Sequence, residues 1–310
     1  MPFAVLPGVR LAYERLDPPA GGPATPAAPA AEVVLIHGLG ANLAFWYWGV
    51  GRPLGQLFPL TAYDLRGHGR SEITAAGYTT AAMAADLLAL LDHLGVERAH
   101  LVGHSFGGAV ALHAAVLAPG RVASLTLVDA ILRLFQPRPR LSDCPNWESL
   151  ERTYSELGIV LEGDAEIDYR LLEALAERSA RRGPRQSSDP TVFLPFESWN
   201  GSQRSAERWR QLLKTTSLAD DVKDPAGLSH EAVAALELPL LAVYGELTYT
   251  MPSLEGLAAV QPAIERVVVP GVGHFFPALQ PQPLVDAVTR FLHVGAARTA
   301  RDATPILDRP

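Results

Sequence analysis

Hydrophobic positions along the chain follow two alternating patterns. Short apolar runs such as Val33-Val34-Leu35-Ile36 are rich in β-branched residues and have no polar side, which is typical of strands buried on both faces of a parallel sheet. Residues 9–16 alternate between apolar and polar positions enough to predict a first strand. Further strand-like runs cover residues 58–64, 99–102, 123–128, 238–244 and 265–269.

Helical periodicity separates these runs. Between Thr80 and Leu94, apolar residues recur at spacings of three and four, and Gly95 follows as a helix stop signal. The residues on this apolar stripe are Met83, Leu87, Leu90, Leu91 and Leu94. Because strands alternate with helices, the pattern predicts an α/β fold with a mostly parallel sheet and helices on both faces.

The alternation stops between residues 131 and 236. This stretch has many prolines and helical patterns such as Ile167-Leu171-Leu175, but no convincing strand. We interpret residues 131–236 as a helical cap inserted into a core formed by residues 1–130 and 237–295. Residues 18–31, rich in Pro, Gly and Ala, predict a mobile surface loop, and a frayed C-terminal tail is expected from Gly295, with residues 296–310 outside the core.

Composition narrows the class of protein. With 310 residues and 48% hydrophobic residues, the chain can bury a large core, and one elaborated domain is expected. The net charge of −7 gives no electrostatic footprint for nucleic acid. Cys144 is the single cysteine, so no intrachain disulfide can form. The N-terminus lacks a secretory pattern and no run is long enough to span a membrane, so we expect a soluble cytoplasmic protein with no membrane partner.

A serine between glycines stands where a strand must turn into a helix. The segment Gly103-His104-Ser105-Phe106-Gly107-Gly108 directly follows an apolar run and precedes a helix-forming one. Such a tight turn strains its central residue and needs small neighbours to avoid clashes. It lifts the Ser105 hydroxyl above the sheet, where a base can reach it and the N–H of Phe106 faces an incoming carbonyl oxygen. Ser105 is therefore the candidate nucleophile.

A serine hydroxyl needs a base, and His274 is the best placed of the nine histidines. It lies in a glycine-flanked loop after the last predicted strand, where an imidazole can reach over the carboxyl edge of the sheet. Its ordinary pKa near 6.5 suits proton transfer at neutral pH. His37 and His104 neighbour the motifs and are expected mainly to shape loops.

Four motifs follow predicted strands in a defined order. They are His37-Gly38-Leu39-Gly40, then Tyr63-Asp64-Leu65-Arg66-Gly67-His68-Gly69-Arg70-Ser71, then the serine turn, and finally Gly271-Val272-Gly273-His274. In this order and spacing the chain resembles the α/β-hydrolases over nearly all of its length outside the cap. The resemblance implies an eight-stranded sheet and a serine hydrolase or esterase.

The same resemblance assigns the oxyanion donors. They are the backbone N–H groups of Leu39 and Phe106, and losing one such donor typically lowers the rate about 10²–10³-fold. Dehalogenases and epoxide hydrolases of this fold carry aspartate where Ser105 stands, so those activities are disfavoured.

More than one residue could supply the carboxylate that completes a Ser–His–acid triad. The usual family position for the acid is Thr248 in Gly245-Glu246-Leu247-Thr248, and threonine carries no negative charge. Asp129 ends the strand next to that of Ser105 and is the preferred candidate, as in some haloalkane dehalogenase relatives. Glu246 is the alternative acid, and a Ser–His dyad or an acid from the cap also stays open.

Aromatic residues indicate the substrate side. Tryptophans occur only near residues 46–48 and in the cap. Together with nearby phenylalanines, they predict an apolar pocket for a medium-sized, largely apolar small molecule. Trp46, Gly38 and His104 are the candidate substrate contacts.

The sequence therefore predicts hydrolysis of a carboxylic ester or related acyl bond through an acyl-enzyme. A thioester, lactone or carbon–carbon bond, or acyl transfer or cyclisation in a biosynthetic pathway, is an alternative use of the same residues. A weakly active ligand-binding relative is the alternative from another class. No zinc spacing or phosphate-binding loop occurs, so no metal and no cofactor are expected; the sequence leaves the oligomeric state open.

Overall fold

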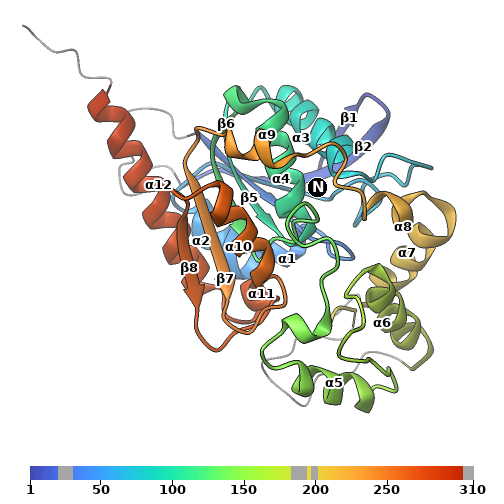
Figure 1. The fold of residues 1–310 in the computed structure, drawn as a ribbon. Helices are drawn as coiled ribbons and strands as arrows, with labels where there is room; N and C mark the ends of the chain where they lie inside the picture. Colours follow the sequence, from blue (N-terminus) through green and yellow to red (C-terminus); the bar gives the residue numbers. More distant parts are fainter. Residues whose placement is uncertain (20–30, 183–193, 197–201, 303–310) are drawn as a thin grey trace, which may run out of the picture.

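A single eight-stranded sheet forms the centre of the molecule (Figure 1). The computed structural model describes residues 1–19, 31–182, 194–196 and 202–302. The strand order is β1-β2-β4-β3-β5-β6-β7-β8, and all pairs from β4 to β8 are parallel, whereas β1 and β2 pair antiparallel with their neighbours. The strands are β1 Phe3–Leu6, β2 Val9–Leu16, β3 Glu32–Ile36, β4 Leu60–Tyr63, β5 Ala99–His104, β6 Val122–Val128, β7 Leu240–Gly245 and β8 Glu265–Val269.

The mostly parallel eight-stranded sheet predicted from the sequence is confirmed, and only β1 went unpredicted. A two-residue turn, Pro7-Gly8, joins β1 to β2, with Gly8 at φ 78°. Proline followed by a glycine with positive φ is a turn signal. The strand itself has only four residues, too few for an alternation to stand out.

Two hydrophobic clusters show that helices cover both faces of the sheet. Val34 and Ile36 of β3 pack into one cluster, whereas Val33 and Leu35 pack into the other, and all four are fully buried. This two-sided burial is the reason for the continuous apolar run. The first cluster contains residues of α3 Thr80–Leu94, α4 Phe106–Leu117, α9 His230–Ala234 and α10 Met251–Val260. The second contains residues of α1 Ala44–Trp46, α2 Arg52–Gly55, α11 Phe276–Leu279 and α12 Gln282–Asp302.

Helix α3 has the bounds that its sequence predicts, because both ends carry strong local signals. The hydroxyl of Thr79 accepts a hydrogen bond from the N–H of Ala82 at 3.1 Å and caps the start. At the other end, Gly95 takes the left-handed conformation, with φ 67°, that ends many helices.

Helices α5 to α8 lie between β6 and β7 in the chain, to one side of the sheet (Figure 1). The N–H of Tyr78 donates to Asp221 of α8 at 2.9 Å, and Arg208 Nε of α7 donates to the carbonyl of Gly67 at 2.9 Å, so α7 and α8 are held against the loop after β4. The short helix α9 instead contacts α4 and α10. The domain division at residues 131 and 236 stays a prediction. The four helices are α5 Trp147–Glu156, α6 Tyr169–Arg182, α7 Ser202–Thr215 and α8 Leu218–Asp221.

The C-terminal part differs from its prediction. Helix α12 continues to Asp302, whereas a frayed end was expected from Gly295. The sequence after Gly295 is rich in alanine and arginine, which are strong helix formers. Most of the predicted loop 18–31 and the last residues of the predicted tail lie outside the described residues. Within the described part, no helix has both the length and the apolar character needed to cross a membrane.

Candidate active site

Ser105 occupies a strained position at the junction of β5 and α4. Its backbone has φ 55° and ψ −124°, which for a residue with a side chain costs about 1–3 kcal/mol. The neighbouring glycines permit this turn: a Cβ on Gly103 would lie 2.4 Å from the carbonyl oxygen of Gly107, and one on Gly107 would lie 2.4 Å from that of His37. The strained turn raises Ser105 at the carboxyl end of the sheet, as the sequence predicts.

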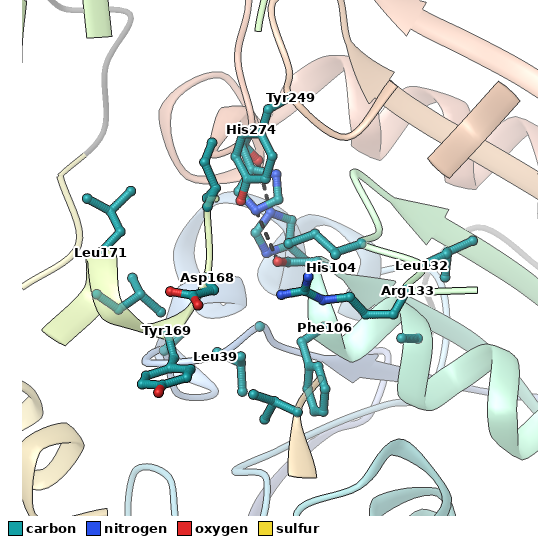
Figure 2. A pocket seen from close by; sticks show the side chains of 18 of the residues that line it. Leu39, His104, Phe106, Leu132, Arg133, Asp168, Tyr169, Leu171, Tyr249 and His274 are labelled. Atoms are coloured by element: carbon teal, nitrogen blue, oxygen red, sulfur yellow. Dashed lines mark hydrogen bonds between the residues drawn. The ribbon is translucent and has the colours of Figure 1, made fainter. Parts of the chain in front are cut away.

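His274 contacts the serine from the loop between β8 and α11. Its Nε2 lies 3.0 Å from the Oγ of Ser105. The Nε2–H of His104 donates to the carbonyl of His274 at 2.9 Å and so fixes the loop backbone (Figure 2). Burial lowers the pKa of His274 to about 3, which leaves the imidazole neutral at pH 7 and able to accept a proton.

Asp129 is the carboxylate that the sheet brings to His274. In the register of β5 and β6, His104 pairs with Val128, so Ser105 and Asp129 both follow the same level of the sheet. The Oδ1 of Asp129 lies 3.9 Å from the Nδ1 of His274, which is longer than a hydrogen bond. Within the described part of the chain, His274 Nδ1 has no hydrogen-bond partner.

A network of donors holds Asp129 in place. Its Oδ2 accepts the N–H of Gly245 at 3.0 Å, and its Oδ1 accepts the hydroxyl of Thr250 at 2.9 Å. Thr248 lies 3.0 Å from Thr250, hydroxyl to hydroxyl, so the residue at the usual acid position belongs to this network. Burial raises the pKa of Asp129 to about 7.

The alternative acid, Glu246, points elsewhere. Its side chain is exposed, and its Oε2 accepts the N–H of Gly271 at 2.8 Å. The structure therefore places Asp129, and not Glu246, beside His274.

The two candidate oxyanion donors lie beside the serine. Leu39 and Phe106 both line the cavity above Ser105, and their backbone N–H groups have no hydrogen-bond partner among the described residues. Gly38 lets this loop approach closely, because a Cβ there would lie 2.9 Å from the Cβ of Ser105. His37 fixes the loop: its Nδ1–H donates to Gly38, and its Nε2 accepts the N–H of Leu65 at 3.0 Å.

The serine and histidine open into a cavity of about 120 Å³. Gly38, His104 and Phe45 line it, whereas Trp46 does not. Trp46 is fully buried in the second hydrophobic cluster, and only its neighbour Phe45 reaches the cavity, because neighbouring residues of a helix point in different directions. The prediction that Trp46 is a substrate contact is therefore corrected, because Trp46 does not reach the cavity; Phe45 lines it instead.

The predicted cap aromatics divide between several places. Trp209 and Phe196 line a second cavity of about 400 Å³, which shares Leu39, Ala41, Phe45, Pro195 and Phe275 with the first. Trp147 packs beside Gly163, and Phe135 packs beside Gly256. Phe193, Trp199 and the side chain of Trp48 lie outside what the structure describes.

Several residues that line the cavity were not predicted from the sequence. The ring of Tyr249 lies 4.7 Å from that of His274, and Arg133 and Asp168 enter the same cavity (Figure 2). Tyr249 directly follows the vacated acid position, which is a signal that could have drawn attention to it. Arg133 and Asp168 stand in irregular segments, where neither periodicity nor a motif marks them.

Comparison with known proteins places this geometry in a family. The family model of the alpha/beta hydrolase fold matches residues 32–279. The chain is 41% identical over 129 residues (42% of this chain, 32% of the relative) to the dihydrolipoyllysine-residue acetyltransferase component of the acetoin cleaving system of Cupriavidus necator. It is 46% identical over 104 residues (33% of this chain, 39% of the relative) to the putative carbamate hydrolase RutD of Variovorax paradoxus. The chain thus spans about a third of the length of these curated relatives.

Solved structures agree in fold. A thermophilic esterase from Thermogutta terrifontis matches with a TM-score of 0.59 and 25% identity, covering 93% of this chain and 94% of that one. Est816, described as an N-acyl homoserine lactone degrading enzyme, matches with a TM-score of 0.65 and 22% identity, covering 94% of this chain and 100% of that one. With the family model spanning most of its length, the chain belongs to the α/β-hydrolase fold family.

Proposed function

We propose that the protein is a serine hydrolase that cleaves a carboxylic ester or a related acyl bond through an acyl-enzyme. The observation that carries this proposal is the 3.0 Å contact between His274 Nε2 and Ser105 Oγ at a strained strand-to-helix turn. A nucleophile and a neutral base within hydrogen-bond distance are what acyl transfer requires first.

Each step of the reaction then has a residue to perform it. Ser105 attacks the carbonyl carbon while its proton passes to His274 Nε2, and the N–H groups of Leu39 and Phe106 stabilise the oxyanion. His274 gives the proton to the leaving alcohol and later removes one from water, which attacks the acyl-enzyme and releases the acid. His274 is neutral before the reaction starts, so it can accept the proton in the first step.

Asp129 completes the triad in this proposal. Proton transfer from Ser105 makes His274 a cation, which attracts the carboxylate 3.9 Å from its Nδ1. Contacts of catalytic groups are often long before substrate binds and shorten in the reacting complex. Ionised Asp129 then orients the ring and stabilises its charge.

The cavity favours a medium-sized, largely apolar small molecule. Its lining consists mainly of aliphatic and aromatic side chains, among them Phe45, Leu112, Leu132, Leu172 and Leu175. The names of similar proteins, an esterase, a lactone-degrading enzyme and a putative carbamate hydrolase, support hydrolysis next to a carbonyl group as the reaction class.

An active-site fluorophosphonate tests the proposal. We expect one adduct per chain, which peptide mass mapping places on Ser105, and strongly slowed labelling of His274→Ala because the serine then lacks its base. His293→Ala, an exposed histidine on α12, is the matched control and should be labelled like the wild type. If the folded wild-type protein forms no adduct on Ser105, the serine-hydrolase proposal is wrong and the ligand-binding alternative is favoured.

A further inference from the structure

One arginine side chain enters the cavity from the segment after β6. The lining there is mostly apolar, but it also includes the carboxylates of Asp168 and Asp224. Arg133 lines the cavity, its side chain is 13% exposed, and Figure 2 shows its guanidinium group extending across the site toward Asp168. A buried guanidinium group among leucines is costly unless its donors are satisfied. The guanidinium group has five N–H donors, and each needs an acceptor.

Two acceptors hold one nitrogen of this guanidinium group. Arg133 Nη1 donates to the carbonyl of Pro137 at 2.7 Å and to Glu166 Oε1 at 2.8 Å, which accounts for both of its hydrogens. Among the residues that the structure describes, no hydrogen bond is found from its Nε or Nη2. The Nε/Nη2 edge, with which arginine binds planar oxygen pairs in bidentate fashion, thus has no protein partner there.

The carboxylate on the facing wall does not fill this role. The side chain of Asp168 is 1% exposed, and it accepts hydrogen bonds from the Nε of Arg170 at 2.9 Å and from its backbone N–H at 2.8 Å. Lys223 Nζ lies 3.9 Å from the same carboxylate. No ion pair between Asp168 and Arg133 occurs among the described residues, so Asp168 has its own cations and leaves the Arg133 edge open.

We propose that the Nε/Nη2 edge of Arg133 is a polar subsite for the acyl part of the substrate. The substrate class is then an ester whose acyl chain is apolar near the scissile carbonyl and carries a hydrogen-bond acceptor, a carboxylate or a neutral carbonyl group, further along. This inference rests on the proposed function and deepens it, because it separates such esters from plain alkyl esters. The ion pair with Glu166 makes the edge rigid, which lowers the entropic cost of binding.

Three p-nitrophenyl esters of matched length test the subsite: hexanedioate with a terminal carboxylate, 5-oxohexanoate with a neutral ketone, and hexanoate with neither. For the wild type, kcat/KM of the acceptor-bearing esters should exceed that of hexanoate roughly 10- to 100-fold, as expected for hydrogen bonds to a charged group. A preference for hexanedioate over the ketone identifies an anion as the remote group, and equal rates identify a carbonyl group.

The ratio of acceptor-bearing to plain ester is the readout in the variants. In Arg133→Met it should fall to near one, and in Arg133→Lys, which keeps the charge without the bidentate edge, it should fall in part. Arg290→Met is the matched control, since Arg290 also binds a glutamate, Glu265, at 2.8 Å but on the exposed side of α12, and its ratio should stay at the wild-type value. A wild type without preference, or a preference that survives in folded Arg133→Met or unchanged in Arg133→Lys, overturns the subsite. Labelling of Ser105 by the fluorophosphonate in the same wild-type sample separates this failure from failure of the proposed function.

Discussion

The carboxyl edge of the sheet and the cavity wall after β6 differ in what fixes their side chains. At the sheet edge, Ser105 and Asp129 follow paired strands. The backbone N–H of Ser105 donates to Val128 and that of Asp129 donates to Val243, and these bonds fix both residues at the same level of the sheet. On the wall, Arg133 and Asp168 stand in irregular segments, and ion pairs hold them. Strand register thus positions the proposed reacting groups, whereas ion pairs between side chains position the groups proposed to meet the rest of the substrate.

The largest effect should come from the acid at the sheet edge. We expect Asp129→Asn to lower kcat of ester hydrolysis by about 10²–10⁴-fold, because the imidazolium formed at His274 loses its counter-charge. Glu246→Gln is the matched control and should stay within about twofold, since its carboxylate lies outside the site. If Glu246→Gln lowers kcat strongly and Asp129→Asn does not, the assignment of Asp129 as the acid is wrong.

A smaller effect tests how α7 is held against the loop after β4. Arg208 of α7 donates to the carbonyls of Gly67 and Ser71 in the loop after β4. Arg208→Met should lower the free energy of unfolding by about 1–3 kcal/mol, because it leaves these acceptors unpaired. Urea denaturation measures this loss, and hydrogen exchange should become faster in α7.

The exposed Lys214 on the same helix provides the control for that experiment. Lys214→Met should change the free energy of unfolding by no more than about 0.5 kcal/mol. Equal stability losses in the two variants would show that the contact from Arg208 to the loop does not fasten α7.

The smallest effect is a shift of pH dependence. Burial raises the pKa of Asp129 to about 7 and lowers that of His274 to about 3. Because the active form needs ionised Asp129 and neutral His274, kcat/KM should rise with pH and level off above about 7. In Asp129→Asn only His274 can take up the proton, so the residual activity should persist to lower pH. If kcat/KM of this variant still falls below about pH 7 as in the wild type, Asp129 does not control the loss of activity at low pH.

Much of the fold could be predicted because its signals are local. The two-sided burial of β3 produces an unbroken apolar run, and the cap at Thr79 and the glycine at Gly95 mark both ends of α3. Strand β1 is too short for a pattern, and α12 passes Gly295 because the residues beyond it favour a helix.

The residues of the candidate site also differ in how far the sequence predicts them. The glycines around Ser105 and Gly271 before His274 report backbone constraints, so they mark the candidate reacting groups in the sequence. Trp46 was placed wrongly because composition shows that an aromatic residue is present but not which way it points. The contact of Arg133 with Glu166 joins residues far apart in the chain, and no local pattern encodes it.

Ser105 should carry the acyl group during turnover, and trapping this acyl-enzyme is the sharpest test of the proposed reaction. Rapid mixing with a p-nitrophenyl ester, acid quenching and peptide mass mapping should show a burst of nitrophenol and a mass increase equal to the acyl group on Ser105. An acyl group on another residue, or undiminished turnover by Ser105→Ala, would contradict the account.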